Sequence, residues 1–410
     1  MSSLIRDIGG ITKFSFLPVA YLISTVVLLI GSDLFLGVAL GIFLLLLSGE
    51  LISTKDNEEF DYGHDGLFKL HLCLSAFILI SYLLVFLWFV MAPQVDFLGL
   101  AQLMNTQLDL DIMEPRQDMS SLMVSSVWLF TFFAPPFLAI VIAHELIHKP
   151  SGTLSYRIGV TAQIVTFMSY FSIAHPRGHH NLVCLDDDPA TPRRGENFYT
   201  FMLRSLIGQR VQAWELEKHR LANKQLPAMH WSNQALQRYL LEILFASSVI
   251  AYGGLPAAAA ILFIALSSNI TMEMTNYAHH YGLVRQKGKP VGARHTWDNT
   301  YKITTFMAMG GTRHSYHHLK ADTPYWHYKD VKGAAAETIA GLFTSIFLSL
   351  IPPLHRRLIT PKLIDWDWKL ATPVEQQLAV AASRLSGQTE LISHADELES
   401  YLQSNDRMVG

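Results

Sequence analysis

The chain has 410 residues, of which 50% are hydrophobic and 16% charged, and its formal net charge is −3. Long apolar runs with so few charges are typical of a membrane protein, and this charge gives no sign of nucleic-acid binding. Two cysteines, Cys73 and Cys184, are too few for a disulfide scaffold, a four-cysteine iron site or an iron–sulfur cluster. Any electrons that the protein uses must therefore come from another protein.

Taken in chain order, six apolar runs are expected to form spanning helices, for which about 20 mainly apolar residues are needed. They cover residues 16–32, 35–53, 70–92, 121–143, 239–253 and 255–275. Gly253, Gly254 and Pro256 separate the last two runs, and these residue types favour a tight reversal. A seventh run, 156–174, is shorter and carries polar residues, so we expect it to lie at the membrane interface without crossing.

The basic residues favour one orientation of these spans. With the N-terminus inside, Arg116 is the only one of the 31 lysines and arginines that falls in an outward-facing loop. Basic residues concentrate on the cytoplasmic side of membrane proteins. We therefore expect an all-α, multi-pass protein of the cytoplasmic (inner) membrane, with both termini and the long loops on the cytoplasmic side.

Histidines gather in four segments that this topology places on the cytoplasmic face. They are His144 and His148, then His175, His179 and His180, then His280, and finally His314, His317 and His318. Taken singly, each cluster could be an ordinary surface group. Together they indicate a metal site, provided that 156–174 does not cross the membrane.

The first segment, His144-Glu145-Leu146-Ile147-His148, also matches the signature of zinc peptidases, in which the glutamate activates water. A zinc ion takes four ligands at most, and a peptidase needs only one beyond this pair. Eight or nine imidazoles suit two first-row metals better, and iron is the one that activates O₂. Glu145 lies about 100° around the helix from His144, so we expect it to support the ligands.

Polar residues before His280 favour a place for this histidine in the site. Glu273, Asn276 and His280 are spaced to share one helix face, and polar residues in a spanning helix are costly unless they serve a site. Glu273 and Asn276 could orient ligand imidazoles through hydrogen bonds. Asp188 could do the same, or could belong to a turn before Pro189.

These segments resemble the integral-membrane alkane 1-monooxygenases and xylene monooxygenases, non-haem diiron enzymes of the membrane desaturase–hydroxylase superfamily. The resemblance rests on HELIHK (144–149), HPRGHHNLVCLDDDPATPRRGENFY (175–199), NYAHHYGL (276–283), RHSYHHL (313–319) and IPPL (351–354). It implies that nine histidines bind two iron ions: His144, His148, His175, His179, His180, His280, His314, His317 and His318.

The chain departs from the alkane enzymes beside these ligands. Ala174, His279 and Tyr316 stand where alkane enzymes usually carry acidic residues, and in these places the chain looks more like the xylene branch. His279 could be an extra ligand, a hydrogen-bond partner or neither.

The resemblance further implies hydroxylation of a terminal methyl group, in a medium-chain alkane or an alkyl-aromatic, to a primary alcohol with O₂ and two electrons. The substrate would reach the site through a channel between the spans. Rubredoxin, reduced by a flavin-containing reductase, would supply the electrons, and its docking residues are expected to be Arg193, Arg194 and Arg313.

Two other readings of the histidine segments remain open. A fatty-acid desaturase or decarboxylase would use the same histidines, and a membrane transporter or metal-binding protein would bind metal without oxygen-dependent turnover. In each case we expect three regions: four spans in 1–143, a histidine-rich region with two further spans in 144–362, and a cytoplasmic tail in 363–410.

Overall fold

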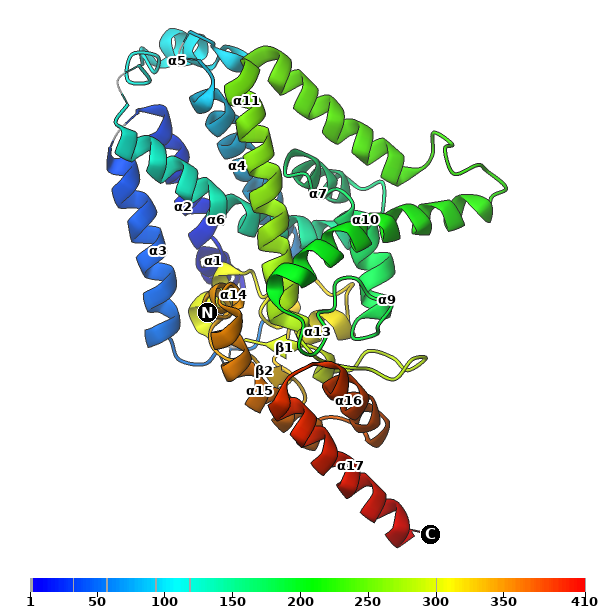
Figure 1. Ribbon diagram of the computed structural model, residues 1–410. Coiled ribbons are helices and arrows are strands. Elements are labelled where there is room, and N and C mark those ends of the chain that lie inside the picture. Colours follow the sequence, from blue (N-terminus) through cyan, green and yellow to red (C-terminus); the bar gives the residue numbers. More distant parts are fainter. Residues whose placement is uncertain are drawn as a thin grey trace.

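The computed structural model describes residues 3–31, 33–56, 58–92, 94–117, 119–299 and 301–409, and this part of the chain is almost entirely helical (Figure 1). The N-terminal half contains α1 (Ser3–Phe14), α2 (Phe16–Leu29), α3 (Leu34–Ile52), α4 (Asp65–Val90), η1 (Phe97–Gly99), α5 (Leu100–Leu108), α6 (Ser121–Ile147), α7 (Leu154–Val165), α8 (Phe171–Ala174), η2 (His175–His179) and α9 (His180–Leu182).

The C-terminal half contains α10 (Phe198–Ala222), α11 (Gln234–His280), η3 (Ala293–His295), α12 (Lys302–Met307), α13 (His314–Leu319), η4 (Tyr325–His327), α14 (Leu342–Ser349), α15 (Pro352–Lys369), α16 (Pro373–Leu385) and α17 (Thr389–Val409). Two short strands, β1 (Trp297–Asp298) and β2 (Ala336–Glu337), pair in parallel among the described residues.

Apolar helices make the chain a membrane protein. Among the described residues, α3, α4 and α11 are long and apolar enough to cross a bilayer, and α1 with α2, bent by 53°, would make a fourth span if the pair counts as one. The helix α6 has 27 residues and contains the predicted run 121–143. Residue 32, at the end of the first predicted run, lies outside the described residues. That the chain crosses the membrane six times stays a prediction.

The run 156–174 forms no long helix. The helix α7 within it has 12 residues, which makes it about 18 Å long and too short to cross a bilayer. The chain then turns at Phe167 and enters the short helix α8. This geometry allows the histidines before and after the run to lie together.

The helix α11 breaks where the sequence predicts a reversal. Gly254 has φ +62 within a helix that otherwise runs from Gln234 to His280, a backbone conformation that glycine adopts without steric cost. Pro256 follows at the start of the second arm. We call residues 234–253 the first arm and 255–280 the second arm, and Figure 1 shows them diverging from the break.

The C-terminal tail packs against the histidine-rich region. The predicted boundary at residue 363 falls inside α15, so the tail does not begin at a helix end. The buried carboxylate of Asp367 receives two hydrogen bonds from Arg194, at 2.6 and 2.7 Å. Glu375 accepts hydrogen bonds from Arg294, and its Oε1 lies 2.8 Å from Nε2 of His295. Two buried carboxylates thus hold the tail to the loops that lead into and out of the site.

Candidate metal centre

The first histidine pair lies at the end of α6. His144 is in the last turn of the helix and His148 is its C-terminal cap, so residues four apart present their rings on one face. The ring centroids lie 5.2 Å apart. The Nε2 atoms of both residues are buried and have no hydrogen-bond partner.

The second histidine segment depends on a π-helical turn. The helix η2 (His175–His179) has π geometry, which brings residues five apart onto one face, and Nε2 of His175 lies 3.0 Å from Nε2 of His180. A Cβ atom at Gly178 would collide with the side chain of Gln212 on α10. Glycine at 178 therefore allows α10 to pack closely against this turn. Such π turns are frequent at functional sites.

The last histidines lie on the short helix α13 and at the end of α11. His314 and His318, one turn apart, place their Nε2 atoms 3.1 Å from each other. Nε2 of His280, the last residue of α11, lies 3.2 Å from Nε2 of His314. The backbone N–H of Ser315 donates to Asp298 at 2.8 Å and fixes the start of α13.

All nine predicted ligand histidines come together, and they separate into two groups. His144, His148, His175, His180 and His317 form a five-imidazole group, and His179, His280, His314 and His318 form a four-imidazole group. Within each group the nearest ligand nitrogens lie within 4.8 Å of one another. We use these two names below.

The chemistry of both groups fits a metal ion. Three Nε2 atoms, from His175, His180 and His317, lie in series at 3.0 Å spacings, and His180 cannot place one proton toward both neighbours. Adjacent ligands about 2.1 Å from a shared ion have nearly this spacing. Burial lowers the pKa of His175, His180 and His317 well below the usual value, so these imidazoles are neutral and their lone pairs are free to bind metal.

In the four-imidazole group, a carboxylate holds one ligand directly. Nδ1 of His179 donates to Asp188 at 2.8 Å, and both side chains are buried. Thr191 donates to the same carboxylate oxygen at 2.6 Å. A carboxylate on the far nitrogen fixes the tautomer and the orientation of a metal-binding imidazole, and the supporting role expected for Asp188 stays a prediction.

In the five-imidazole group, a tyrosine lies between the ligand imidazole and the carboxylate. Nδ1 of His317 lies 2.8 Å from the hydroxyl of Tyr328, which donates to Glu145 at 3.4 Å. Glu145 also forms a 2.6 Å ion pair with Lys149. Glu145 is thus connected to His317 through Tyr328, and its supporting role stays a prediction. No sequence motif marks Tyr328 as a residue of the site.

The remaining predicted supporting residues have more distant roles. Glu273 accepts from Gln209 at 2.8 Å and from Asn276 at 3.2 Å, so it contacts side-chain amides. His279 donates through Nδ1 to the carbonyl of Trp297 at 3.0 Å and stacks on His314, with ring centroids 4.2 Å apart. It belongs to neither group of nitrogens.

Two of the three arginines predicted to dock an electron carrier are buried, which corrects that expectation. Arg194 donates to Asp367, Ser383 and the carbonyl of Gly282. Arg313 is 1% exposed, pairs with Asp56 at 2.7 Å and lies over the ring of Phe60. A docking protein cannot reach either guanidinium group. Arg193 is exposed and keeps the predicted role as a proposal.

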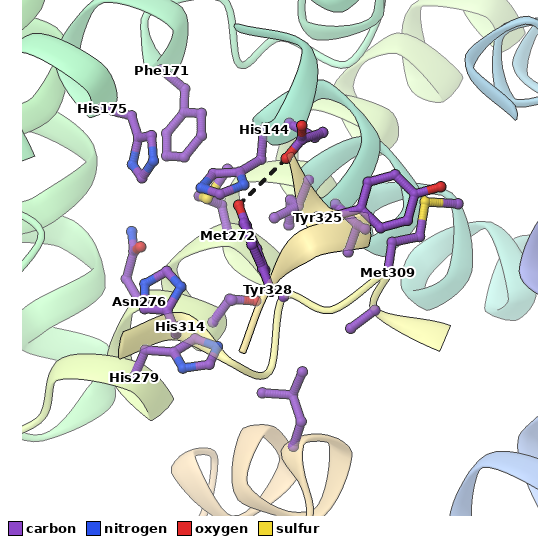
Figure 2. Close-up of a pocket in the computed structure, with 17 residues that line it drawn as sticks. His144, Phe171, His175, Met272, Asn276, His279, Met309, His314, Tyr325 and Tyr328 are labelled. Atoms are coloured by element: carbon purple, nitrogen blue, oxygen red, sulfur yellow. Dashed lines mark hydrogen bonds between the residues drawn. The ribbon is translucent and has the colours of Figure 1, made fainter. Parts of the chain in front are cut away.

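One cavity lies beside the histidines, and a larger apolar cavity lies on the other side of α11. The inner cavity, about 60 Å³, is bordered by His144, His175 and His314 together with Phe171, Met272 and Tyr328, and Figure 2 shows these side chains around it. The apolar cavity, about 410 Å³, lies between α2, α3, α6, α11 and α14. Thr271 and Met274 line the apolar cavity while Met272 and Thr275 line the inner one, so the same turns of α11 border both.

Comparison with known proteins agrees with this geometry. A family model described as fatty acid desaturase matches residues 123–347. The chain is 33% identical over 237 residues to alkane 1-monooxygenase 1 of Pseudomonas aeruginosa, covering 55% of this chain and 60% of that protein. It is 29% identical over 286 residues to the xylene/toluene monooxygenase hydroxylase component of Pseudomonas putida, covering 68% and 73%. An alkane 1-monooxygenase of Ectopseudomonas oleovorans is 30% identical, with 56% and 58% covered. The chain thus spans about 60% of the length of the alkane 1-monooxygenases that it matches.

Proposed function

We propose, from the premise that this chain belongs to the fatty acid desaturase family, that it is a membrane non-haem diiron monooxygenase. It inserts one oxygen atom of O₂ into a terminal methyl group of a medium-chain alkane or an alkyl-aromatic and forms a primary alcohol. The similar proteins carry monooxygenase names, which favours hydroxylation over the alternative of a desaturase or decarboxylase with the same histidines.

One observation supports this proposal above the others: nine imidazoles form two groups, and members of both groups line a small cavity next to a larger apolar one. Two iron ions, one in each group, would supply the activation of O₂ and the two-electron chemistry. The imidazoles hold the metals. Asp188 fixes the orientation of the His179 ring, and Tyr328, which donates to Glu145, fixes that of the His317 ring. A single zinc with H-E-x-x-H ligands would use only a fraction of these nitrogens.

The cavities suit an apolar substrate that enters from the bilayer. Side chains such as Leu40, Phe43 and Leu129 line the apolar cavity, and its volume of about 410 Å³ is in the range of ligand pockets. A chain-like molecule lying there would direct one end past Met274 and Met272 toward His144. Met272, Phe171 and Met309 line the inner cavity with apolar surface and exclude water around the reacting methyl group.

The proposal includes the membrane topology and the electron donor. The protein has six spans in the cytoplasmic membrane, with its termini and metal centre on the cytoplasmic side. The three regions are 1–143, 144–362 and a cytoplasmic tail in 363–410. Rubredoxin, with its reductase, delivers the electrons at that face, and exposed Arg193 contributes to its docking.

Product analysis tests the reaction. Membranes that contain the protein are incubated with octane or xylene, reduced rubredoxin and ¹⁸O₂, and we expect a primary alcohol that carries one ¹⁸O atom. His280→Ala should abolish the product, whereas His219→Ala, a change at an exposed position on α10, should not. An alkene product would contradict hydroxylation and support the desaturase alternative. Full activity of His280→Ala would show that this histidine is not part of the centre.

A further inference from the structure

The helix α10 has two faces of opposite character. One face is buried and carries Phe198, Phe201, Ser205, Gln209, Ala213, Glu217 and Leu221. The other face carries an apolar stripe of Tyr199, Leu203, Ile207 and Val211, which are 50%, 59%, 67% and 55% exposed. Four large apolar side chains at a spacing of four residues form one continuous line along a helix. A stripe of this kind marks a surface that meets something other than water.

The apolar stripe covers only the first half of the exposed face. Farther along the same face, Lys218 and His219 are exposed, so the character of the face changes from apolar to charged. In the loop after α10, Met229 and Trp231 are again 68% and 75% exposed. Exposed tryptophan next to apolar surface is typical of the boundary between lipid and water.

The apolar stripe adjoins the exposed apolar surface of α11. Tyr239, on the first arm of α11, donates to the carbonyl of Arg210 at 3.3 Å, and the same arm exposes Leu240 and Leu244. On the other side, Arg210 donates to Asn269 of the second arm at 2.9 Å. Both arms belong to a helix that is apolar and long enough to span a bilayer. Figure 1 shows α10 crossing the foot of the second arm and projecting away from the helix bundle.

We propose that α10 lies in the bilayer interface on the histidine side, with Tyr199, Leu203, Ile207 and Val211 among lipid acyl chains and Trp231 at the level of the headgroups. The continuity of this stripe with the exposed leucines of α11 selects lipid as the occupant. An amphipathic helix in this position buries its apolar face at the boundary between headgroups and acyl chains.

The lipid contact has a consequence for the metal centre. The opposite face of α10 supports the π-helical turn η2, because Gln212 packs against Gly178 and Glu217 forms a 2.8 Å ion pair with Arg177. The helix α10 therefore contacts lipid with one face and the second histidine segment with the other. This inference does not depend on which reaction the centre performs.

Spin labels test the position of α10. Leu203→Cys, Ile207→Cys and Lys218→Cys are each labelled with a nitroxide in a Cys73→Ser background, where the remaining Cys184 is buried. The full chain is reconstituted into vesicles of phosphatidylcholine and phosphatidylglycerol. We expect labels at 203 and 207 to be more accessible to O₂, which dissolves in lipid, than to a water-soluble nickel chelate. The label at 218 should show the reverse.

Two outcomes would overturn the proposal. One is greater access of the nickel chelate to the labels at 203 and 207. The other is spin–spin broadening that disappears on dilution with unlabelled protein, which would show that a second copy of the chain covers the stripe. Should the cysteine variants fail to fold, fluorescence gives a second measurement. Brominated lipids should quench the wild type more strongly than Trp231→Phe, and equal quenching would remove Trp231 from the interface.

Discussion

The hydroxyl of Tyr328 lies 2.8 Å from Nδ1 of His317. Because Nε2 of His317 faces the other imidazoles of its group, the proton of this ring belongs on Nδ1, where Tyr328 can accept it. The tyrosine hydroxyl is then directed to Glu145, and Arg313 holds the backbone carbonyl of residue 328 at 2.6 Å. The five-imidazole group is thus anchored to a carboxylate through a phenol, whereas the four-imidazole group contacts Asp188 directly.

Tyr328→Phe should weaken metal binding in the five-imidazole group alone. Loss of a group that orients a ligand typically costs about 10- to 100-fold in metal affinity. Titration of the metal-free protein with Co²⁺, followed by its visible absorption, measures this change. Tyr199→Phe removes a hydroxyl that bonds Leu350 on the exposed side of the chain and serves as the control. Equal affinities in both variants would leave Tyr328 with no role in positioning His317.

Asp188→Asn should affect the other group. The amide cannot accept from His179, Thr191 and the N–H of Ala190 as the carboxylate does, and one of these donors would lose its partner. We expect a loss of metal affinity of about 10- to 100-fold in the four-imidazole group. Asp187→Asn changes an exposed neighbour paired with Lys287, and it should bind metal as the wild type does. A loss shared equally by both variants would point to a general effect of charge.

Ala39→Phe should narrow the range of substrates. Ala39 lines the apolar cavity, and a phenyl ring there reduces the space for a long molecule. We expect turnover of longer alkanes to fall more than turnover of shorter ones, measured as the ratio of kcat/KM values. Gly41→Phe adds a ring on the opposite side of α3, where a Cβ meets open space, and should keep the wild-type ratio. An unchanged ratio in Ala39→Phe would place the substrate elsewhere.

Asp367→Asn should destabilise the fold rather than impair docking of an electron carrier. The side chains of Arg194 and Asp367 are fully buried, and breaking a buried ion pair by changing one partner costs about 3–5 kcal/mol. Thermal unfolding in detergent should shift to a lower temperature. Asp396→Asn weakens an ion pair of Arg384 on the exposed face of the tail and should shift unfolding little, because exposed pairs contribute about 0–1 kcal/mol. Similar unfolding temperatures in both variants would contradict a structural role of Asp367.

Arg193→Glu should slow electron transfer without loss of stability. Arg193 is exposed, and attraction between a basic surface and an acidic carrier raises the rate of association. We expect slower reduction at low salt and a smaller difference from the wild type at high salt, because salt screens exposed charges. Stopped-flow measurement of reduction by rubredoxin provides the rates. A rate that does not change at low salt would exclude Arg193 from docking.

The sequence predicts which residues meet in the centre better than it predicts their supports. Histidine spacing on helices indicates ligands, and the break at Gly254 follows from residue types that disfavour a continuous helix. The division of ligands between two groups depends on a π-helical turn at 175–179 and on helices far apart in the chain, which spacing alone does not reveal. Arg194 and Arg313 look like surface charges in the sequence, because their partners Asp367 and Asp56 are more than a hundred residues away.

Counting metal ions per chain tests the central claim most directly. The protein is purified in detergent, and iron and zinc are measured in the wild type, in His148→Ala and in His318→Ala, each of which removes one ligand from a different group. We predict two iron ions per chain in the wild type and the loss of iron from only the altered group in each variant. One zinc ion per wild-type chain, or loss of both ions in either variant, would contradict a centre built from two groups of imidazoles.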